Sequence, residues 1–141
     1  QYFSRNYVTN KLIKVPSIAT FMPLYAGCIT KEGAEQLVQG LQDKKAYWPK
    51  FPVPTIPISD PLFKQHGYWQ GPAWINTNWL IIDGLKRYDY DELAENLKQK
   101  TLNLVAEHGC YEYFSPVDGS PAGAANFSWT AALAIDLLHQ Q

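Results

Sequence analysis

The chain has 141 residues, a length that predicts one domain with a single core. Twelve basic and thirteen acidic side chains leave a formal net charge of -1, so the sequence offers no basic face for nucleic acid or an anionic membrane. No apolar run approaches the roughly 18 residues that cross a bilayer, and the N-terminal stretch lacks the pattern of a signal peptide. We therefore expect a cytoplasmic protein that binds neither nucleic acid nor membrane.

The composition is poor in charge and rich in aromatic side chains. Charged residues make up 18% of the chain, below the roughly 25% of ordinary globular domains, whereas 14% are Phe, Trp or Tyr. Cys28 and Cys110 lie far apart and the three histidines are scattered, which matches neither a metal-ligand spacing nor a disulfide framework. We expect two free, mostly buried thiols, no metal and no cofactor.

The first two elements are short. Residues 1–15 have apolar or aromatic side chains on both sides of the turn-prone Thr9-Asn10 pair, which predicts a small β-hairpin. Residues 17–28 form an apolar run in which Pro23 shortens any helix and Gly27 ends it. We expect this run to be buried.

A clear helix and an extended segment follow. Thr30 is placed to cap an amphipathic helix with apolar residues at helical spacing, which are Ala34, Leu37, Val38 and Leu41. Five prolines between residues 48 and 61 then exclude regular helix. This segment is either a linker or a stretch packed along the fold, and its apolar side chains favour the packed alternative.

Three further helices are predicted. Pro72 suits the first position of a helix that runs to Tyr88 and is apolar around most of its circumference. Residues 92–109 form an amphipathic helix that ends at Gly109, and Ser128 can cap a last, nearly all-apolar helix that runs to residue 141.

Enclosed and amphipathic helices thus alternate along the chain. Successive αα-hairpins with one buried and one amphipathic member build two helix layers, so the pattern predicts an all-α fold with a small N-terminal hairpin. Loops longer than about 15 residues, such as the two here, are uncommon unless they carry function. We expect one face to hold a site.

A cluster of tryptophans and amides lies at residues 67–79, in the sequence GYWQGPAWINTNW. Indole faces stack on the C–H faces of sugar rings, and amides hydrogen-bond to hydroxyl groups, so this mixture suits a carbohydrate site. Trp74 and Asn78 lie on one side of the predicted helix, at i and i+4. The alternative is that these tryptophans belong to the core and the asparagines satisfy internal hydrogen bonds.

Glu112 stands among aromatic neighbours in the irregular segment after residue 109, in the sequence YEYFSPVDG. A carboxylate in that setting suits a general base that acts on water, or else is an ordinary glutamate of a surface loop. Inverting glycosidases use a second carboxylate about 6.5–9.5 Å away. Of the aspartates, Asp118 reads as a turn residue, and Asp83 and Asp136 read as structural carboxylates or polar groups of a pocket.

Three strings in this order, GYWQGPAWINTNWLIIDGLKRY, YEYFSPVDG and FSWTAALAIDLL, resemble the C-terminal part of glycoside hydrolase family 63, near its bacterial mannosylglycerate and glucosylglycerate hydrolases. The similarity extends over nearly the whole chain. It implies a partial (α/α)6 toroid, an inverting α-glycosidase activity and Glu112 as the catalytic base. It also implies a set of residues at or near the sugar, which are Trp69, Gln70, Gly71, Trp74, Asn78 and Trp129.

The chain departs from that family in size. A complete barrel needs twelve helices, whereas about five are predicted here. The aspartate that serves as the catalytic general acid in that family lies upstream of the part that this chain matches. We therefore expect residues 1–141, without an internal boundary, to be the C-terminal part of the catalytic domain of a hydrolase of small α-glucosides or α-mannosides. Its partners would be the sugar and either the N-terminal part of the barrel or a second copy, covering an apolar flank. The alternatives are a sugar-binding module without turnover and a helical interaction domain.

Overall fold

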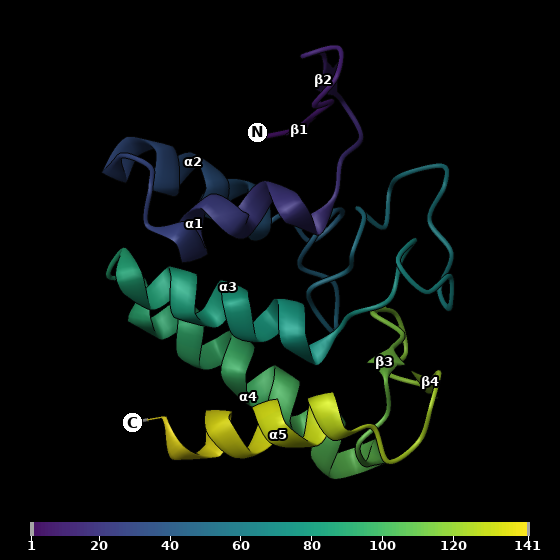
Figure 1. Ribbon diagram of the computed structural model, residues 1–141. Helices are drawn as coiled ribbons and strands as arrows, with labels where there is room; N and C mark the ends of the chain where they lie inside the picture. The colour runs from purple at the N-terminus through teal and green to yellow at the C-terminus, as the bar shows by residue number, and fades with distance from the viewer. Residues whose placement is uncertain (1, 141) are drawn as a thin grey trace.

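The computed structural model describes residues 2–140 (Figure 1). Gln1, in the predicted hairpin, and Gln141, in the predicted last helix, lie outside the described residues. Within that range the chain forms five α-helices, one short 3-10 helix and two two-stranded antiparallel hairpins. In chain order these are β1 (Ser4–Arg5), β2 (Leu12–Ile13), η1 (Ile18–Phe21), α1 (Met22–Ala26), α2 (Lys31–Leu41), α3 (Ile75–Arg87), α4 (Asp91–His108), β3 (Tyr113–Phe114), β4 (Pro121–Ala122) and α5 (Ser128–His139).

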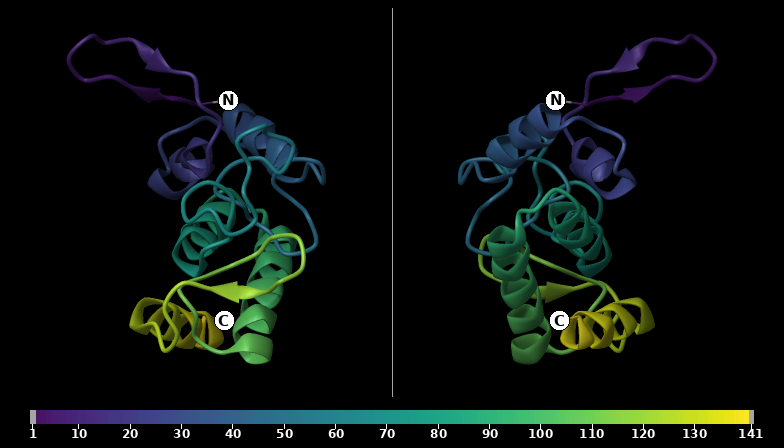
Figure 2. Two further views of the ribbon diagram at one scale, coloured as in Figure 1. Left: turned by 90° about the vertical axis from the view of Figure 1, so that its right-hand side faces the viewer. Right: turned by 90° about the vertical axis from the view of Figure 1, so that its left-hand side faces the viewer.

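The helices form two layers, as predicted. In the views of Figure 2, α1, α3 and α5 lie in one row, and α2 and α4 lie in a second row beside it. The β1–β2 hairpin stands away from this body (Figure 2).

Helix α3 is the centre of the packing and contacts α1, α4 and α5. Its Gly84 permits the close approach of α1, because a Cβ atom there would lie only 2.7 Å from the backbone nitrogen of Tyr25. The core around it combines apolar side chains of η1, α1, α2, α3 and α4, among them Phe21, Leu24, Leu37, Ile81, Ile82, Leu85 and Leu97.

The local signals for α1 and α2 are confirmed. Helix α1 has Pro23 in its first turn and ends at Gly27, which adopts the left-handed conformation (φ 63°) that glycine reaches without strain. The hydroxyl of Thr30 accepts a hydrogen bond from the N–H of Gly33 (3.2 Å), as expected of an N-cap.

Helix α3 begins later than predicted, at Ile75 rather than Pro72. The reason is tertiary: Ala73 is held in extended backbone because it exchanges two hydrogen bonds with Phe114, at 2.8 and 2.9 Å. The extended backbone at Ala73 therefore pairs with Phe114, and the helix can begin only after this β-bridge.

Helix α5 differs from its prediction in two respects. Its N-cap is Phe127, and Ser128 makes no capping hydrogen bond. The helix is also not enclosed, since Ile135 and Leu138 remain 58% and 68% exposed. One side of α5 packs on α3 and α4, and no other element of residues 2–140 covers the opposite side.

The proline-rich segment packs into the molecule, as the apolar side chains indicated. Residues 52–57 are buried, and Pro54 forms a β-bridge with Ala73. The long loops gather at one end of the helices, on the right of Figure 1, together with β3 and β4. The proline-rich segment, the loop before α3 and the segment between α4 and α5 thus meet at one end of the helices.

The prediction for the thiols is partly wrong. Both cysteines are free, but Cys28 is exposed and Cys110 is partly exposed. None of the helices in residues 2–140 has both the length and the apolar character needed to cross a membrane.

Candidate active site

Glu112 lies where α4 gives way to the β3–β4 hairpin. The helix ends at Gly109, which has a φ of 85°, and the chain then turns towards β3. The N–H of Glu112 donates to the carbonyl of Ala124 (3.0 Å), and the N–H of Ala124 donates back to Oε2 of Glu112 (3.1 Å). Ala124, which follows β4, therefore holds both the backbone and the carboxylate of Glu112. Glu112 stays partly exposed.

Gly123 closes the same site from beside Ala124. It has a φ of 74°, and a Cβ atom at this position would lie 2.5 Å from Oε2 of Glu112 and 2.7 Å from the ring of Tyr113. Only glycine fits this conformation and this space without displacing the carboxylate.

Three aromatic rings stack beside Glu112. Trp69 and Trp74 are nearly parallel, with centroids 4.0 Å apart, and Trp74 stacks in turn on Tyr113 at 5.1 Å. Tyr68 meets all three rings edge-on, at 5.2 to 5.9 Å. The ring of Tyr113 and the carboxylate of Glu112 both approach Gly123, at 2.7 and 2.5 Å from the position that a Cβ atom would take there, so this stack adjoins the carboxylate.

The two stacked tryptophans have different roles. Trp69 is 41% exposed, so it is available to a sugar ring. Trp74 is only 2% exposed, lies between two rings, and donates its indole N–H to the carbonyl of Tyr68 (3.1 Å). The burial of Trp74 therefore argues against a direct contact with sugar. Trp74 instead packs against one face of the Trp69 ring.

Asn78 is likewise part of the scaffold. It is fully buried; its Oδ1 accepts from the N–H of Val53 (3.0 Å), and its Nδ2 donates to the carbonyl of Pro52 (3.0 Å) and to the hydroxyl of Thr101 (2.9 Å). With its amide committed to these partners, Asn78 has no access to a sugar hydroxyl. The alternative reading of this asparagine, as an internally satisfied amide, describes it better.

Gln70 and Gly71 lie next to Trp69 in the chain. The side chain of Gln70 is exposed, and its carbonyl accepts from the N–H of Lys64 (2.8 Å). Gly71 is buried, donates its N–H to the hydroxyl of Thr55 (2.9 Å), and has no room for a Cβ atom because the carbonyl of Lys64 occupies that space. Gly71 thus anchors the loop, and Gln70 remains a candidate contact.

Trp129 reaches this end of the molecule from α5. It is 48% exposed and neighbours Thr130, whose hydroxyl donates to the carbonyl of Tyr111 (2.7 Å). The N–H of Phe127 also donates to the carbonyl of Cys110 (2.8 Å). These bonds attach the start of α5 to the residues just before Glu112.

Four polar residues that the sequence analysis did not select as site residues connect the two loops of the site. Nε2 of Gln65 donates to Oδ2 of Asp118 (2.6 Å), and Nε2 of His66 lies 2.9 Å from the hydroxyl oxygen of Ser120. Hydrogen bonds from Ser120 are the main cause that lowers the pKa of Asp118 well below its ordinary value. Nothing in the linear sequence pairs these residues, because more than fifty positions separate the partners.

The other aspartates near the site in sequence are engaged in local structure. Asp118 accepts from the N–H of Ser120 (3.0 Å), which confirms its reading as a turn residue. Asp83 pairs with Arg87 at 2.8 Å, and Oδ2 of Asp136 accepts from the indole N–H of Trp79 (2.6 Å), which lowers the pKa of Asp136. Within residues 2–140, no group of three or more His, Cys, Asp or Glu is arranged to hold a metal ion.

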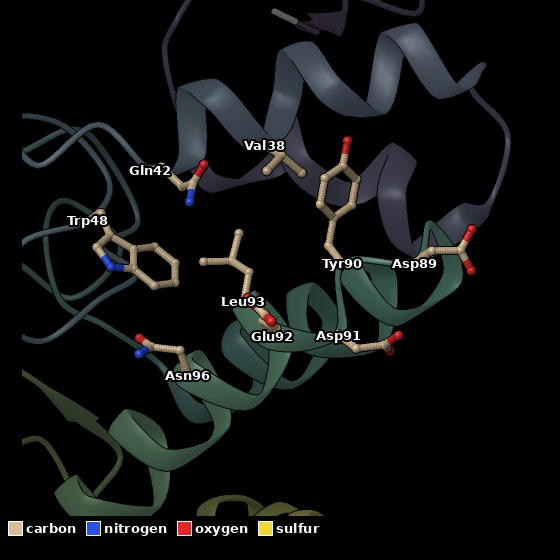
Figure 3. Close-up of a pocket in the computed structure, with 9 residues that line it drawn as sticks. All are labelled: Val38, Gln42, Trp48, Asp89, Tyr90, Asp91, Glu92, Leu93 and Asn96. Carbon is tan, nitrogen blue, oxygen red and sulfur yellow. The ribbon is translucent and has the colours of Figure 1, made fainter.

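A separate hollow of about 700 Å³ lies between α2 and α4 (Figure 3). Val38 of α2 and Gln42, which follows α2 directly, line it from one side, and Leu93 and Asn96 of α4 line it from the other (Figure 3). The predicted site residues do not line this hollow. We place the candidate site at Glu112, where the carboxylate, the exposed indole and the glycine turn converge.

Comparison with known proteins identifies the family of the chain. The model of a family described as "Mannosylglycerate hydrolase MGH1-like glycoside hydrolase domain" matches residues 1–130. Mannosylglycerate hydrolase from Thermus thermophilus is 37% identical over 136 residues, which cover 95% of this chain and 32% of the relative. Mannosylglycerate hydrolase MGH1 from Selaginella moellendorffii is 36% identical over 137 residues, which cover 95% of this chain and 27% of the relative.

A solved structure shares the fold. The crystal structure of a mannosylglycerate hydrolase of glycoside hydrolase family 63 from Thermus thermophilus, in complex with Tris, superposes with a TM-score of 0.90 at 35% identity and covers 99% of this chain. The chain spans about a third of that structure and of the curated relatives it matches. The all-α fold with paired helices, as part of an (α/α)6 barrel, is thereby confirmed.

Proposed function

The chain belongs to the mannosylglycerate hydrolase MGH1-like glycoside hydrolases, within glycoside hydrolase family 63, and from this membership we propose that it forms the C-terminal part of the catalytic domain of an inverting α-glycosidase. We place all 141 residues in that one domain, without an internal boundary. Small α-mannosides and α-glucosides are the proposed substrates. Two crystal structures of a mannosylglycerate hydrolase from Thermus thermophilus support this class, since one holds glucose and the other holds Tris and D-glycerate.

The observation that carries the proposal is the arrangement around Glu112. Its carboxylate is partly exposed and oriented by the N–H of Ala124, and the Trp69–Trp74–Tyr113 stack adjoins it. In the proposed reaction Glu112 removes a proton from a water molecule, and the oxygen of that water attacks the anomeric carbon. Trp69, with Gln70 and Trp129, would hold the sugar ring beside the water.

The reaction also needs a general acid, and among residues 2–140 the aspartates considered as candidates are engaged by other side chains. Asp83, Asp118 and Asp136 are engaged by Arg87, Ser120 and Trp79 respectively. Protonation of the leaving oxygen requires a second carboxylic acid across the sugar. We propose that this acid comes from the remainder of the barrel.

The remainder of the barrel is also the proposed occupant of the exposed apolar side of α5. Ile135 and Leu138 present large side chains to solvent there, next to a shallow hollow of about 430 Å³ lined by Leu102 and Val105 of α4. Apolar surface of this kind is normally covered in a finished fold.

The substitution Glu112→Gln tests the role of the base in the whole protein. The amide cannot take a proton from water, so we expect the rate of mannose release from mannosylglycerate to fall by about a thousandfold or more, with little change in KM. Glu107→Gln, an exposed site near the end of α4, is the matched control and should retain the wild-type rate. Near-normal turnover by a folded Glu112→Gln variant would contradict the assignment.

Titration of the whole protein with mannosylglycerate or glucosylglycerate, followed by calorimetry and by an assay for free sugar, separates this proposal from the sugar-binding alternative. A hydrolase should release free sugar, whereas a binding module would bind the glycoside at millimolar concentration and release no sugar. If the wild-type protein neither binds nor hydrolyses mannosylglycerate or glucosylglycerate, both functions are excluded.

A further inference from the structure

The loop of residues 60–71, which carries Trp69, is closed mainly upon itself. The N–H of Lys64 donates to the carbonyl of Gln70 (2.8 Å), and the N–H of Gly67 donates to the carbonyl of Lys64 (2.9 Å). Such internal bonds keep the shape of a loop but do not fix its orientation relative to the rest of the molecule. Its orientation depends on contacts with other segments.

Two polar contacts tie this loop to the hairpin that follows Glu112. The bond from Nε2 of Gln65 to Oδ2 of Asp118, here called the Gln65–Asp118 bridge, spans 53 positions of sequence. His66 and Ser120 form a second contact between the same two segments, at 2.9 Å. Both pairs are solvent-exposed, so they do not belong to the apolar core.

Asp118 is a fixed acceptor for this bridge. Its Oδ1 accepts from the N–H and the hydroxyl of Ser120, at 3.0 and 2.7 Å, and its own N–H donates to the hydroxyl of Ser115 (3.2 Å). These hydrogen bonds lower its pKa, so the carboxylate is ionised at neutral pH. A bond to an ionised acceptor is shorter and stronger than one between neutral groups.

We propose that Gln65 and Asp118 are positioning residues for the sugar site, because their bridge sets where Trp69 lies relative to Glu112. This inference rests on the proposed function. Loss of the bridge loosens the loop, which keeps its anchor at Gly71 and its His66–Ser120 contact, and Trp69 then spends less time stacked on Trp74 in the place where a sugar ring would meet it. The chemistry at Glu112 is untouched, since Glu112 is held by Ala124.

The substitution Gln65→Ala in the whole protein tests the proposal, since it removes the bridge and leaves the Asp118 turn intact. We expect KM for mannosylglycerate to rise about three- to tenfold while kcat stays within about twofold. Thermal unfolding, followed by circular dichroism, should be unchanged. Gln99→Ala is the matched control, because Gln99 donates an equally exposed hydrogen bond to Glu95 (2.7 Å) far from the site, and its KM should equal the wild-type value.

A second variant guards against a purely structural explanation. If the two side chains act through one bond, the double variant Gln65→Ala with Asp118→Ala should have the same KM as Asp118→Ala alone. Additive increases in KM would overturn the proposal, and so would a Gln65→Ala variant whose KM is unchanged or whose kcat alone falls.

The outcome for the bridge is distinguishable from the outcome for the proposed function. If the wild-type protein hydrolyses neither mannosylglycerate nor glucosylglycerate, the proposed function fails, and glucose binding followed by tryptophan fluorescence takes over as the measurement. Weaker glucose binding by Gln65→Ala then supports the bridge, and equal affinity overturns it. If the wild-type protein does not bind glucose, both proposals fall.

Discussion

Glu112 and Gly123 illustrate how a single residue position sets the geometry of this site. Gly123 adopts a left-handed conformation and leaves its Cα hydrogen facing the carboxylate, where any side chain would collide with Oε2 of Glu112. The backbone of Ala124 then reaches the same oxygen at 3.1 Å. A glycine without chemistry of its own therefore controls the placement of the proposed base.

Replacement of this glycine should impair both folding and turnover. Gly123→Ala forces a Cβ atom against Glu112 at a φ of 74°, so we expect a loss of about 1–3 kcal/mol of stability and a fall in kcat of about ten- to a hundredfold. Urea unfolding and steady-state kinetics measure the two effects.

Gly40→Ala is the control for that experiment. Gly40 lies in α2, and a Cβ atom there would meet nothing within 4 Å, so alanine should raise stability by about 0.5–1 kcal/mol without affecting turnover. Equal effects of the two substitutions would show that the space beside Glu112 is not restrictive.

At the scale of elements, Asn78 joins three segments that are distant in the sequence. It lies on α3, bonds to both the carbonyl and the N–H of the Pro52–Val53 peptide in the proline-rich segment, and bonds to Thr101 on α4. The hydroxyl of Thr101 donates in turn to the carbonyl of Leu97 (2.8 Å), within α4. Because the proline-rich segment lacks regular structure, this amide supplies hydrogen bonds that a helix or sheet would otherwise provide.

The substitution Asn78→Ala distinguishes a scaffold role from a sugar contact. Removal of the amide leaves the buried carbonyl of Pro52 and the N–H of Val53 without hydrogen bonds and takes one bond from Thr101. We expect a stability loss of about 3 kcal/mol, measured by urea unfolding. Asn103→Ala, an exposed site on α4, should change stability by less than about 0.5 kcal/mol. A stable Asn78→Ala variant with a raised KM would instead place Asn78 at the sugar.

At the scale of the whole molecule, one flank of the helical body exposes large apolar side chains. Helix α5 exposes Ile135 and Leu138, whereas the equivalent apolar faces of α1 and α3 are covered by neighbouring helices. The chain spans about a third of its relatives, so the rest of such a barrel has the size needed to cover this face. The low charge and high aromatic content of the chain agree with a surface that is meant to be covered.

Charge placed on this flank should reveal whether it is covered. In the whole protein, Ile135→Lys with Leu138→Lys would bury two ammonium groups, and we expect a loss of roughly 3 kcal/mol or more and a lower Tm. Leu62→Lys, at an exposed loop position, is the control and should leave Tm unchanged. An unaltered Tm in the double variant would show that the flank faces solvent.

Much of the architecture followed from local patterns. Helical spacing of apolar residues in α2 and α4, the cap at Thr30 and the stops at Gly27 and Gly109 were all readable, because each depends on residues within about one turn of one another. The alternation of helix types also predicted the two layers correctly. The start of α3 was wrong, because a bridge between Ala73 and Phe114 overrides the preference of Pro72 for a helix start.

The sequence by itself therefore determined the helices, their layered arrangement and the likeness to a hydrolase family, and it supplied the proposal that Glu112 and Trp69 are site residues. Only the tertiary structure separated Trp69 from Trp74, since composition cannot tell an indole at the surface from one stacked between two rings. It also showed that the amide of Asn78 is buried and hydrogen-bonded within the protein and that Gln65 meets Asp118. These facts depend on contacts between segments 23 to 53 positions apart, and no pattern within a single segment encodes which distant side chain it will meet.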